Sequence, residues 1–238
     1  MRSPRRYNVA LVIAPGFVVT AGIGTLVNAR IAAGVTYPVI VGGVFVVMMT
    51  AMHAIAGDQH PHDRFGPANA VTAVRLVLVA LMAGLVGHAT TSPLVWGVVG
   101  LTAFIAALDG VDGWFARRSN MASGFGARFD METDALLILI LSILVWQHGK
   151  AGAWVLLCGL MRYAFVGAGR LLPWLARPLR GTWRGKAVAV GQLLGLGVAL
   201  APAVQRPASA MVAAAALAAL TWSFALDIER LRRGDRAT

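Results

Sequence analysis

Residues 109–117 read Asp-Gly-Val-Asp-Gly-Trp-Phe-Ala-Arg, and residues 126–134 read Gly-Ala-Arg-Phe-Asp-Met-Glu-Thr-Asp. Together these two segments hold five of the ten acidic residues of the chain, and each adjoins a long apolar stretch. A carboxylate beside hydrocarbon is costly unless a partner compensates for its desolvation. We therefore expect the neighbouring helices to be arranged so that these acids have compensating partners.

The spacing of the four aspartates is helical. Asp109 and Asp112 are three residues apart, and Asp130 and Asp134 are four apart, so each pair lies on one stripe of a helix. Two helix ends are thus predicted to bring four carboxylates to a common point, where their mutual repulsion requires cations. A hard divalent ion such as Mg²⁺ or Mn²⁺ suits these oxygen ligands, and the set has room for two ions.

The residues around these aspartates extend the pattern. Gly113 and Gly126 carry no side chain, so a bulky ligand can approach the backbone there. Glu132 lies about half a turn off the stripe of Asp130 and Asp134. We interpret it as supporting the metal ligands from behind, or as a partner of the arginine four positions earlier. A helix that begins near residue 129 would hold both aspartates in its first two turns, where the helix dipole favours anions.

The whole pattern, D-x-x-D-G-x-x-A-R followed after eight residues by G-x-x-x-D-x-x-x-D, resembles the signature of the CDP-alcohol phosphotransferases, or CDP-alcohol phosphatidyltransferases. The resemblance implies transfer of a substituted phosphate, such as phosphatidyl from CDP-diacylglycerol, to an alcohol acceptor in phospholipid biosynthesis, with release of CMP. It also implies dimerisation. By the same resemblance, Asp134 is the expected catalytic base, and the expected metal ligands are Asp109, Asp112, Asp130 and Asp134.

Further residues are candidates for binding the donor. Gly113, Arg117 and Gly126 belong to the same signature. Asn69, Thr72 and Arg75 recur every third residue on an otherwise apolar helix and resemble the N-x-x-T-x-x-R element that lines the nucleotide side in this family. Their alternative role is to hydrogen-bond neighbouring helices. An arginine at the depth of Arg75 is costly unless it is paired or faces an aqueous cavity.

The acceptor is left open by the sequence. Gly185-Lys186 and Gln192 resemble the G-K-x-K-T-x-x-Q element of phosphatidylglycerolphosphate synthases, but Val188 and Ala189 replace its second lysine and its threonine. Inositol phosphate, glycerol phosphate, serine, another alcohol and a lipid therefore all remain open as acceptors. For an anionic acceptor, the candidate binding residues are Arg128, Arg162 and Lys186.

The composition is that of an integral membrane protein. The 238 residues are 58% hydrophobic and 13% charged, whereas soluble domains are about a quarter charged. Apolar runs of about 20 residues predict an all-α, polytopic bundle of about eight transmembrane helices. Since the family core has six, residues 1–66 are expected to add two N-terminal helices to a core formed by residues 67–238. The predicted spans are 8–29, 36–56, 68–89, 94–116, 129–147, 151–169, 187–205 and 208–228.

The basic residues set the expected orientation. The net charge is +11, and most basic residues fall on one side if the N-terminus is cytoplasmic. The acid-rich segments then face the cytoplasm of a bacterial plasma membrane, and the arginine-rich loop 170–186 meets anionic lipid headgroups. The tail from Asp227 onward is expected to fray. A nucleic-acid partner is not expected, because no basic stripe with interleaved aromatics occurs. The single cysteine, Cys158, excludes an intrachain disulfide and a cysteine-based metal site.

Two other classes share parts of this pattern. Intramembrane prenyltransferases also use aspartates and metal on a diphosphate, but they need a second acid-rich motif, and the next acid after Asp134 is Asp227. A transporter with intramembrane carboxylates would not need Gly113, Arg117 and Gly126 at fixed offsets. An inactive family member, acting as a binding protein, would not need all four aspartates.

Overall fold

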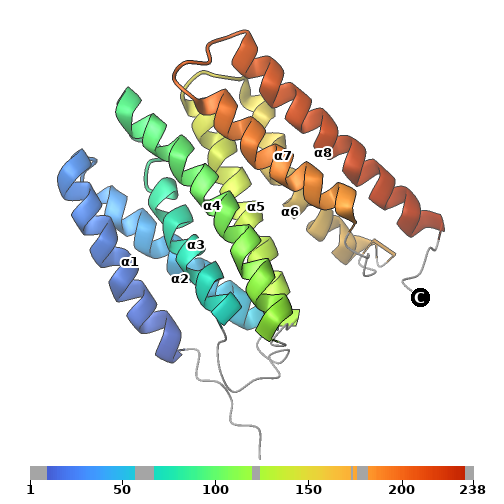
Figure 1. Ribbon diagram of the computed structural model, residues 1–238, viewed down its shortest axis with the longest axis horizontal. Coiled ribbons are helices and arrows are strands. Elements are labelled where there is room, and N and C mark those ends of the chain that lie inside the picture. The colour runs from blue at the N-terminus through green and yellow to red at the C-terminus, as the bar shows by residue number, and fades with distance from the viewer. Residues whose placement is uncertain (1–9, 57–66, 120–123, 173, 176–181, 234–238) are drawn as a thin grey trace, which may run out of the picture. The chain divides into compact units, whose positions relative to one another are not determined.

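The chain is helical throughout its described part. The computed structural model describes residues 10–56, 67–119, 124–172, 174–175 and 182–233, without the side chains of 10–12, 55–56, 67–68 and 109–119. Within these ranges it has no strand, which confirms the all-α prediction (Figure 1). The α-helices are α1 (Ala10–Ile31), α2 (Thr36–Ala56), α3 (Pro67–Ala83), α4 (Ser92–Ser119), α5 (Gly124–Gln147), α6 (Leu157–Leu171), α7 (Trp183–Leu200) and α8 (Ala208–Arg233), with a 3-10 helix, η2 (Ala153–Leu156), before α6.

Several helices have the length and composition of membrane spans. Among the described residues, three stretches are both long and apolar enough to cross a bilayer: Thr36–Ala54, Ala153–Leu171 and Ala208–Arg233. Two further apolar stretches, Asn69–Ala83 and Ser92–Leu108, are shorter than these three. The second ends directly before Asp109, although α4 itself continues beyond it. The expectation of about eight spans is thus supported for part of the chain, and the full number stays a prediction.

Two helix starts differ from the expected ones. α5 begins at Gly124 rather than near residue 129, so Asp130 and Asp134 lie in its second and third turns. The helix dipole, which is felt within the first turn, therefore contributes less to holding these acids than the sequence suggests. α7 begins at Trp183 because the Thr182 side chain accepts a hydrogen bond from the Gly185 backbone N–H at 3.0 Å. Lys186 is consequently helical and not part of a loop.

The contacts divide the chain into two compact units, which we describe separately. The first unit comprises the chain up to Thr90 together with Phe104–Asp134, and the second comprises Thr91–Ala103 with Ala135–Thr238. The units therefore divide α4 and α5 between them. The expected division into residues 1–66 and 67–238 separates two added helices from a family core and does not concern contacts, so it stays a prediction.

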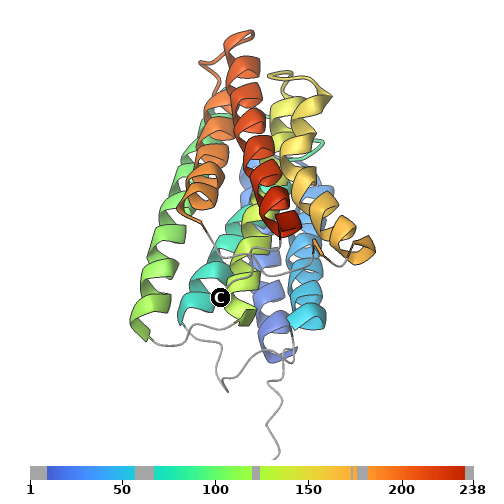
Figure 2. The same ribbon diagram turned by 90° about the vertical axis from the view of Figure 1, so that its right-hand side faces the viewer.

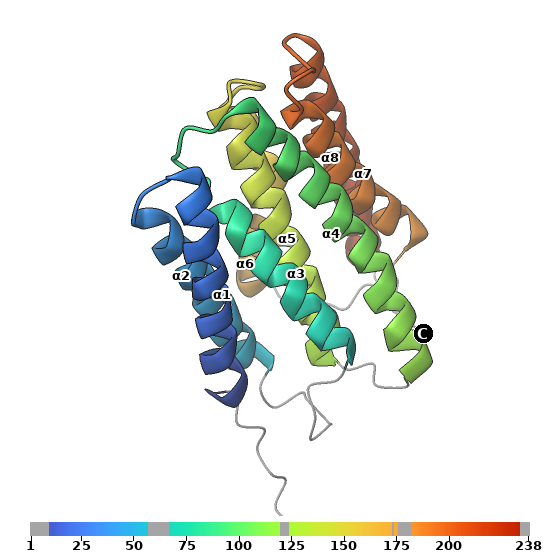
Figure 3. The ribbon, with the colours of Figure 1, turned by 60° about the vertical axis from the view of Figure 1, so that its left-hand side comes forward.

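In the first unit, α2 packs on both α1 and α3 (Figure 3). The buried Tyr37 of α2 donates from its hydroxyl to the Leu81 carbonyl of α3 at 3.0 Å. Its ring packs where a side chain on Gly84 would stand, since an added Cβ would lie 2.7 Å from it. The hydroxyl is thereby satisfied at a backbone position near the end of α3, as a buried tyrosine requires. This contact anchors the helix that carries Asn69, Thr72 and Arg75.

In the second unit, α8 packs on both α7 and α6 (Figure 2). A buried lysine fastens the end of α5 to the turn between α7 and α8. The Lys150 ammonium donates to the carbonyl oxygens of Ala201 at 3.2 Å and Val204 at 2.7 Å, while the Ser209 hydroxyl donates to the Lys150 carbonyl at 2.7 Å. These bonds to carbonyls just after the end of α7 explain how an ammonium can be buried there.

The backbones of α6 and α5 lie close together at Gly159. A Cβ built on this residue would lie 2.4 Å from the Leu139 Cα, so only a glycine allows this spacing. We expect Gly159→Ala to lower the free energy of unfolding by about 2 kcal/mol, because the backbones must separate. Gly167→Ala on the same helix is the control: nothing lies within 4 Å of its added Cβ, so the gain in helix propensity should leave stability equal or up to about 1 kcal/mol higher. Thermal unfolding in detergent measures both, and equal midpoints would contradict the close contact.

Candidate active site

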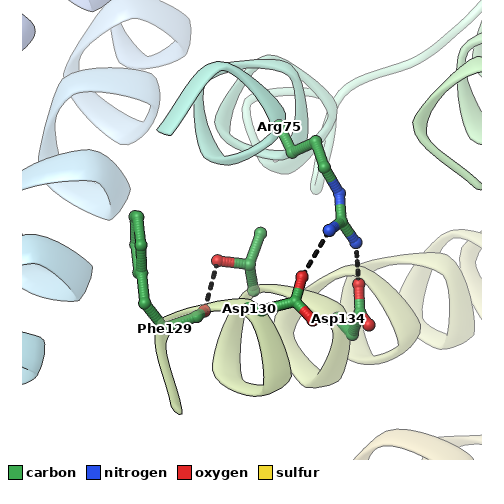
Figure 4. Close-up of polar contacts among 5 residues, drawn as sticks. Arg75, Phe129, Asp130 and Asp134 are labelled. Atoms are coloured by element: carbon green, nitrogen blue, oxygen red, sulfur yellow. Dashed lines mark hydrogen bonds and ion pairs between the residues drawn. The ribbon is translucent and has the colours of Figure 1, made fainter. Parts of the chain in front are cut away.

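An arginine of α3 joins two aspartates of α5 inside the first unit. Arg75 is fully buried, and its guanidinium donates from Nη1 to Asp130 Oδ1 and from Nη2 to Asp134 Oδ1 (Figure 4). Both contacts are also ion pairs. A planar guanidinium can serve two carboxylates at once because its donors are fixed in a fork. The aspartates that the sequence places on one stripe therefore do converge on one point.

The local sequence of α5 explains why these carboxylates face α3. Phe129 is fully buried, and its ring lies 5.9 Å from that of Phe125, so this aromatic face turns into the protein. The Thr133 hydroxyl donates to the Phe129 carbonyl at 2.8 Å, which satisfies it within the helix (Figure 4). With that face buried, Asp130 and Asp134 are held on an adjacent face, one turn apart.

The two carboxylates remain accessible although their partner is not. The side chain of Asp130 is 36% exposed and that of Asp134 is 27% exposed, against 0% for Arg75. The arginine thus holds the acids from the protein side, while part of each acidic side chain is accessible to solvent or a ligand. These three groups together carry a charge of −1, which favours a cation beside them.

The predicted polar stripe of α3 is buried as a whole. Asn69 and Thr72 are 6% and 3% exposed, and they lie on the face that carries Arg75. Burial of three polar side chains on one stripe of an otherwise apolar helix is the arrangement expected of a polar site rather than a lipid-facing surface. Their contact with a nucleotide stays a prediction, as does that of Gly126, which is half-buried in the first turn of α5.

The other half of the predicted metal site lies on α4. The backbone of α4 includes Asp109, Asp112, Gly113 and Arg117 in its last turns, but their side chains are outside the described part of the structure. Within the described part, no group of three histidine, cysteine or acidic side chains could hold a metal ion. The convergence of four carboxylates therefore stays a prediction, of which the α5 half is described.

The three candidate acceptor residues belong to different units. Arg128 is exposed on α5 in the first unit, two residues before Asp130. In the second unit, Arg162 is half-buried on α6 and Lys186 is exposed in the first turn of α7. Their expected contact with an anionic acceptor remains a prediction for all three.

Two pairings were not foreseen from the sequence. The structure pairs Arg75 with Asp130 and Asp134, while its predicted contact with the nucleotide stays a prediction. The sequence offered a partial signal for this pairing, because an arginine at this depth needs either a charged partner or an aqueous cavity. The second correction concerns the C-terminal segment: Asp227 does not fray but lies within α8 and accepts from Arg184 Nη2 at 2.5 Å. Arg184 is accordingly not a freely solvated loop residue.

Comparison with known families agrees with the motif. A family model described as CDP-alcohol phosphatidyltransferase matches residues 65–225, well over half of the chain. The matched range runs from the start of α3 into α8 and includes every predicted site residue. No curated protein and no solved structure shows significant similarity to the chain. The resemblance that the motif indicated is thereby confirmed.

Proposed function

Because the chain belongs to the CDP-alcohol phosphatidyltransferase family, an integral membrane family of lipid synthesis, we propose that it transfers phosphatidyl from CDP-diacylglycerol to an alcohol. The family itself implies transfer of a phosphatidyl group from a CDP-alcohol. The observation that supports placing the reaction at α5 is the convergence of the Asp130 and Asp134 carboxylates on one cationic group. Carboxylates held together in this way suit a site that binds a diphosphate through cations.

The donor chemistry of these residues fits a divalent metal. Asp130 and Asp134 offer hard oxygen ligands on a partly exposed face, and their net charge with Arg75 is negative. We propose that Mg²⁺ or Mn²⁺ is held by these two residues together with Asp109 and Asp112. When bound, the metal would supply positive charge to the diphosphate of the donor and to the leaving CMP.

The chain's own residues have separate roles in the proposed transfer. The acceptor hydroxyl oxygen attacks the phosphorus of the phosphatidyl group, the bond from that phosphorus to the bridging oxygen breaks, and CMP leaves with the electron pair. Asp134 takes the hydroxyl proton. An aspartate has an ordinary pKa of about 3.9 and is a weak base, so its position at the attacking oxygen matters more than its basicity. Arg75 fixes that position by holding the Asp134 carboxylate from the buried side.

The donor and acceptor regions follow from the remaining candidates. Asn69, Thr72 and Arg75 are proposed to contact the nucleotide from the buried stripe of α3. Gly113, Arg117 and Gly126 of the signature motif are proposed to lie around it. Arg128, Arg162 and Lys186 are proposed to bind a negatively charged acceptor such as an alcohol phosphate. We propose that the reaction takes place at the cytoplasmic face of a bacterial plasma membrane, since the basic residues cluster on that side. Neither the prenyltransferase nor the transporter alternative gains support from the family match.

The metal requirement provides the direct test. We expect chelation with EDTA to reduce CMP release from CDP-diacylglycerol by at least about a hundredfold, and added Mg²⁺ or Mn²⁺ to restore it, because metal charge contributes several kcal/mol to such transition states. The assay uses the full chain in membranes, labelled donor, and a panel of alcohols and alcohol phosphates. An alcohol-dependent product identifies the acceptor. CMP release that is insensitive to chelation would refute the proposed metal site.

A further inference from the structure

A groove separates part of α7 from α8 in the second unit, and it has a volume of about 620 Å³. Its wall is almost entirely apolar, and small residues form much of it: Gly191 and Gly195 on α7, and Ala215 and Ala219 on α8. The two helices pack against each other as an antiparallel hairpin (Figures 1 and 2). A hollow of this size is in the range of pockets that bind small molecules.

One end of the hairpin is basic. α7 begins and α8 ends at this end, so the charged residues of the two termini lie at the same level of the antiparallel pair. The described residues there include five basic and two acidic side chains, a net charge of +3: Arg184, Lys186, Arg230, Arg232 and Arg233 against Asp227 and Glu229. Trp183 and Trp222, both largely exposed, line the groove at this end. Exposed tryptophans beside basic residues are typical of the membrane–water interface.

Three buried polar atoms of two side chains in the groove wall have no hydrogen-bond partner. Arg184 donates from Nη2 to Asp227 and lies 5.6 Å from the centroid of the Trp222 ring, but its buried Nε has no acceptor. Gln192 is 1% exposed, and neither atom of its amide has a hydrogen-bond partner, although the weakly bonding Cys158 thiol is within reach. Buried polar groups normally find partners, so a ligand with acceptor oxygens is indicated.

We propose that this groove binds an anionic glycerophospholipid of the surrounding membrane. One acyl chain lies along the glycines and alanines, and the phosphate is bound at Arg184 at the basic end of the hairpin. The Gln192 amide is covered in this structure, so its side chain turns into the groove to donate to an ester carbonyl of the lipid. The lipid is bound intact as a structural ligand, so the proposal does not depend on which reaction the chain catalyses.

The observations favour this occupant over others. A purely apolar occupant would leave Gln192 and the Arg184 Nε without acceptors in a low-dielectric setting. A zwitterionic lipid has no net charge, so it would be attracted only weakly to the end of the hairpin that carries a net charge of +3. Each basic residue there adds to the attraction for an anionic lipid. An anionic glycerophospholipid carries a charged phosphate, then ester carbonyls, then a long acyl chain. The groove offers the matching features in the same order: its basic end, the Gln192 amide and an apolar wall.

The test measures lipid retention by the full chain. The protein is delipidated, mixed with phosphatidylglycerol or phosphatidylcholine of the same acyl chains, and analysed by native mass spectrometry. We expect the bound fraction to be at least about fivefold higher for phosphatidylglycerol, and Arg184→Gln to reduce this preference. Gly191→Phe should lower retention at least about tenfold, since a Cβ on Gly191 meets no atom within 4 Å and the ring can fill the groove without disturbing the fold. Gly97→Phe on α4, also exposed with nothing within 4 Å and outside the groove, is the matched control and should retain lipid normally.

A second arm tests the role of Gln192. A diether analogue of phosphatidylglycerol lacks the ester carbonyls, so wild-type protein should retain it about tenfold less well than the diester, and Gln192→Leu should abolish that difference. If Gln192 is only a buried structural residue, the diester and diether lipids will bind equally well to both forms.

Several results would overturn the proposal. Equal retention by Gly191→Phe and Gly97→Phe would show that the lipid is bound elsewhere. Retention of CDP-diacylglycerol without any of phosphatidylglycerol would assign the groove to the donor instead of a resident lipid. A change of oligomeric state in Gly191→Phe, with lipid retention unchanged, would assign it to a second copy of the chain.

Discussion

Asp134→Asn is expected to lower the turnover number by at least about a hundredfold, because positioned general bases contribute factors of about 10² to 10⁴. Asparagine keeps an oxygen that can accept from Arg75 Nη2, so the packing of α3 on α5 should survive the change. What is lost is the ability to take the proton of the acceptor hydroxyl and the negative charge offered to a cation. Steady-state CMP release, with donor and acceptor each varied, separates these effects.

The expected kinetic pattern is a fall in kcat with less than about a tenfold rise in the KM for the donor. Glu229→Gln is the control, since it removes an exposed carboxylate of α8 that pairs with Arg233 and is no part of the predicted site. Glu229→Gln should retain activity within about tenfold of wild type. Asp134→Asn with near wild-type kcat would exclude Asp134 as the base and leave it at most a metal ligand.

The α5 half of the site could be predicted from spacing alone. Residues four apart on a helix share a face, so Asp130 and Asp134 were bound to lie together once α5 was helical. The family could be predicted as well, because eight fixed positions across two segments are a specific pattern, and the family match confirms it.

The partner of that carboxylate pair could not be predicted with the same security. Helical periodicity shows that Arg75 lies on a polar stripe of α3, but it does not show which helix faces that stripe. The sequence therefore left pairing and an aqueous cavity as alternatives, and only the packing of α3 against α5 decides between them. The same holds for Arg184 and Asp227, which lie 43 residues apart.

Helix ends were the other source of error, for a local reason. The sequence places the start of α5 near Phe129, yet the helix begins at Gly124 and includes the turn of residues 124–128 before it. In a membrane protein the hydrophobic run marks the hydrocarbon, whereas a helix continues into the interface as long as its backbone groups are satisfied. The two aspartates consequently lie deeper in α5 than expected, and their fixation depends on a side-chain cation more than on the helix dipole.

Arg75 should accordingly be among the residues on which the stability of the first unit depends most. We expect Arg75→Gln to lower the free energy of unfolding by about 2 kcal/mol, because the two partly exposed carboxylates lose the buried cation that holds them together. Arg128→Gln, which removes an exposed arginine from α5, should change stability by no more than about 0.5 kcal/mol. Thermal or denaturant unfolding in detergent, without divalent metal, provides the comparison.

The same variant distinguishes a positioning role from a merely structural one. In Arg75→Gln the carboxylates of Asp130 and Asp134 repel each other without a buried counter-charge, so a divalent cation has more repulsion to relieve. Added Mn²⁺ should therefore raise the melting temperature of Arg75→Gln by more than it raises that of wild type, and Asp130→Asn in the same background should remove this extra gain. An equal rise in both proteins would mean that Arg75 and the metal do not act on the same carboxylates. In that case Arg75 would support the packing of α3 on α5 and nothing more.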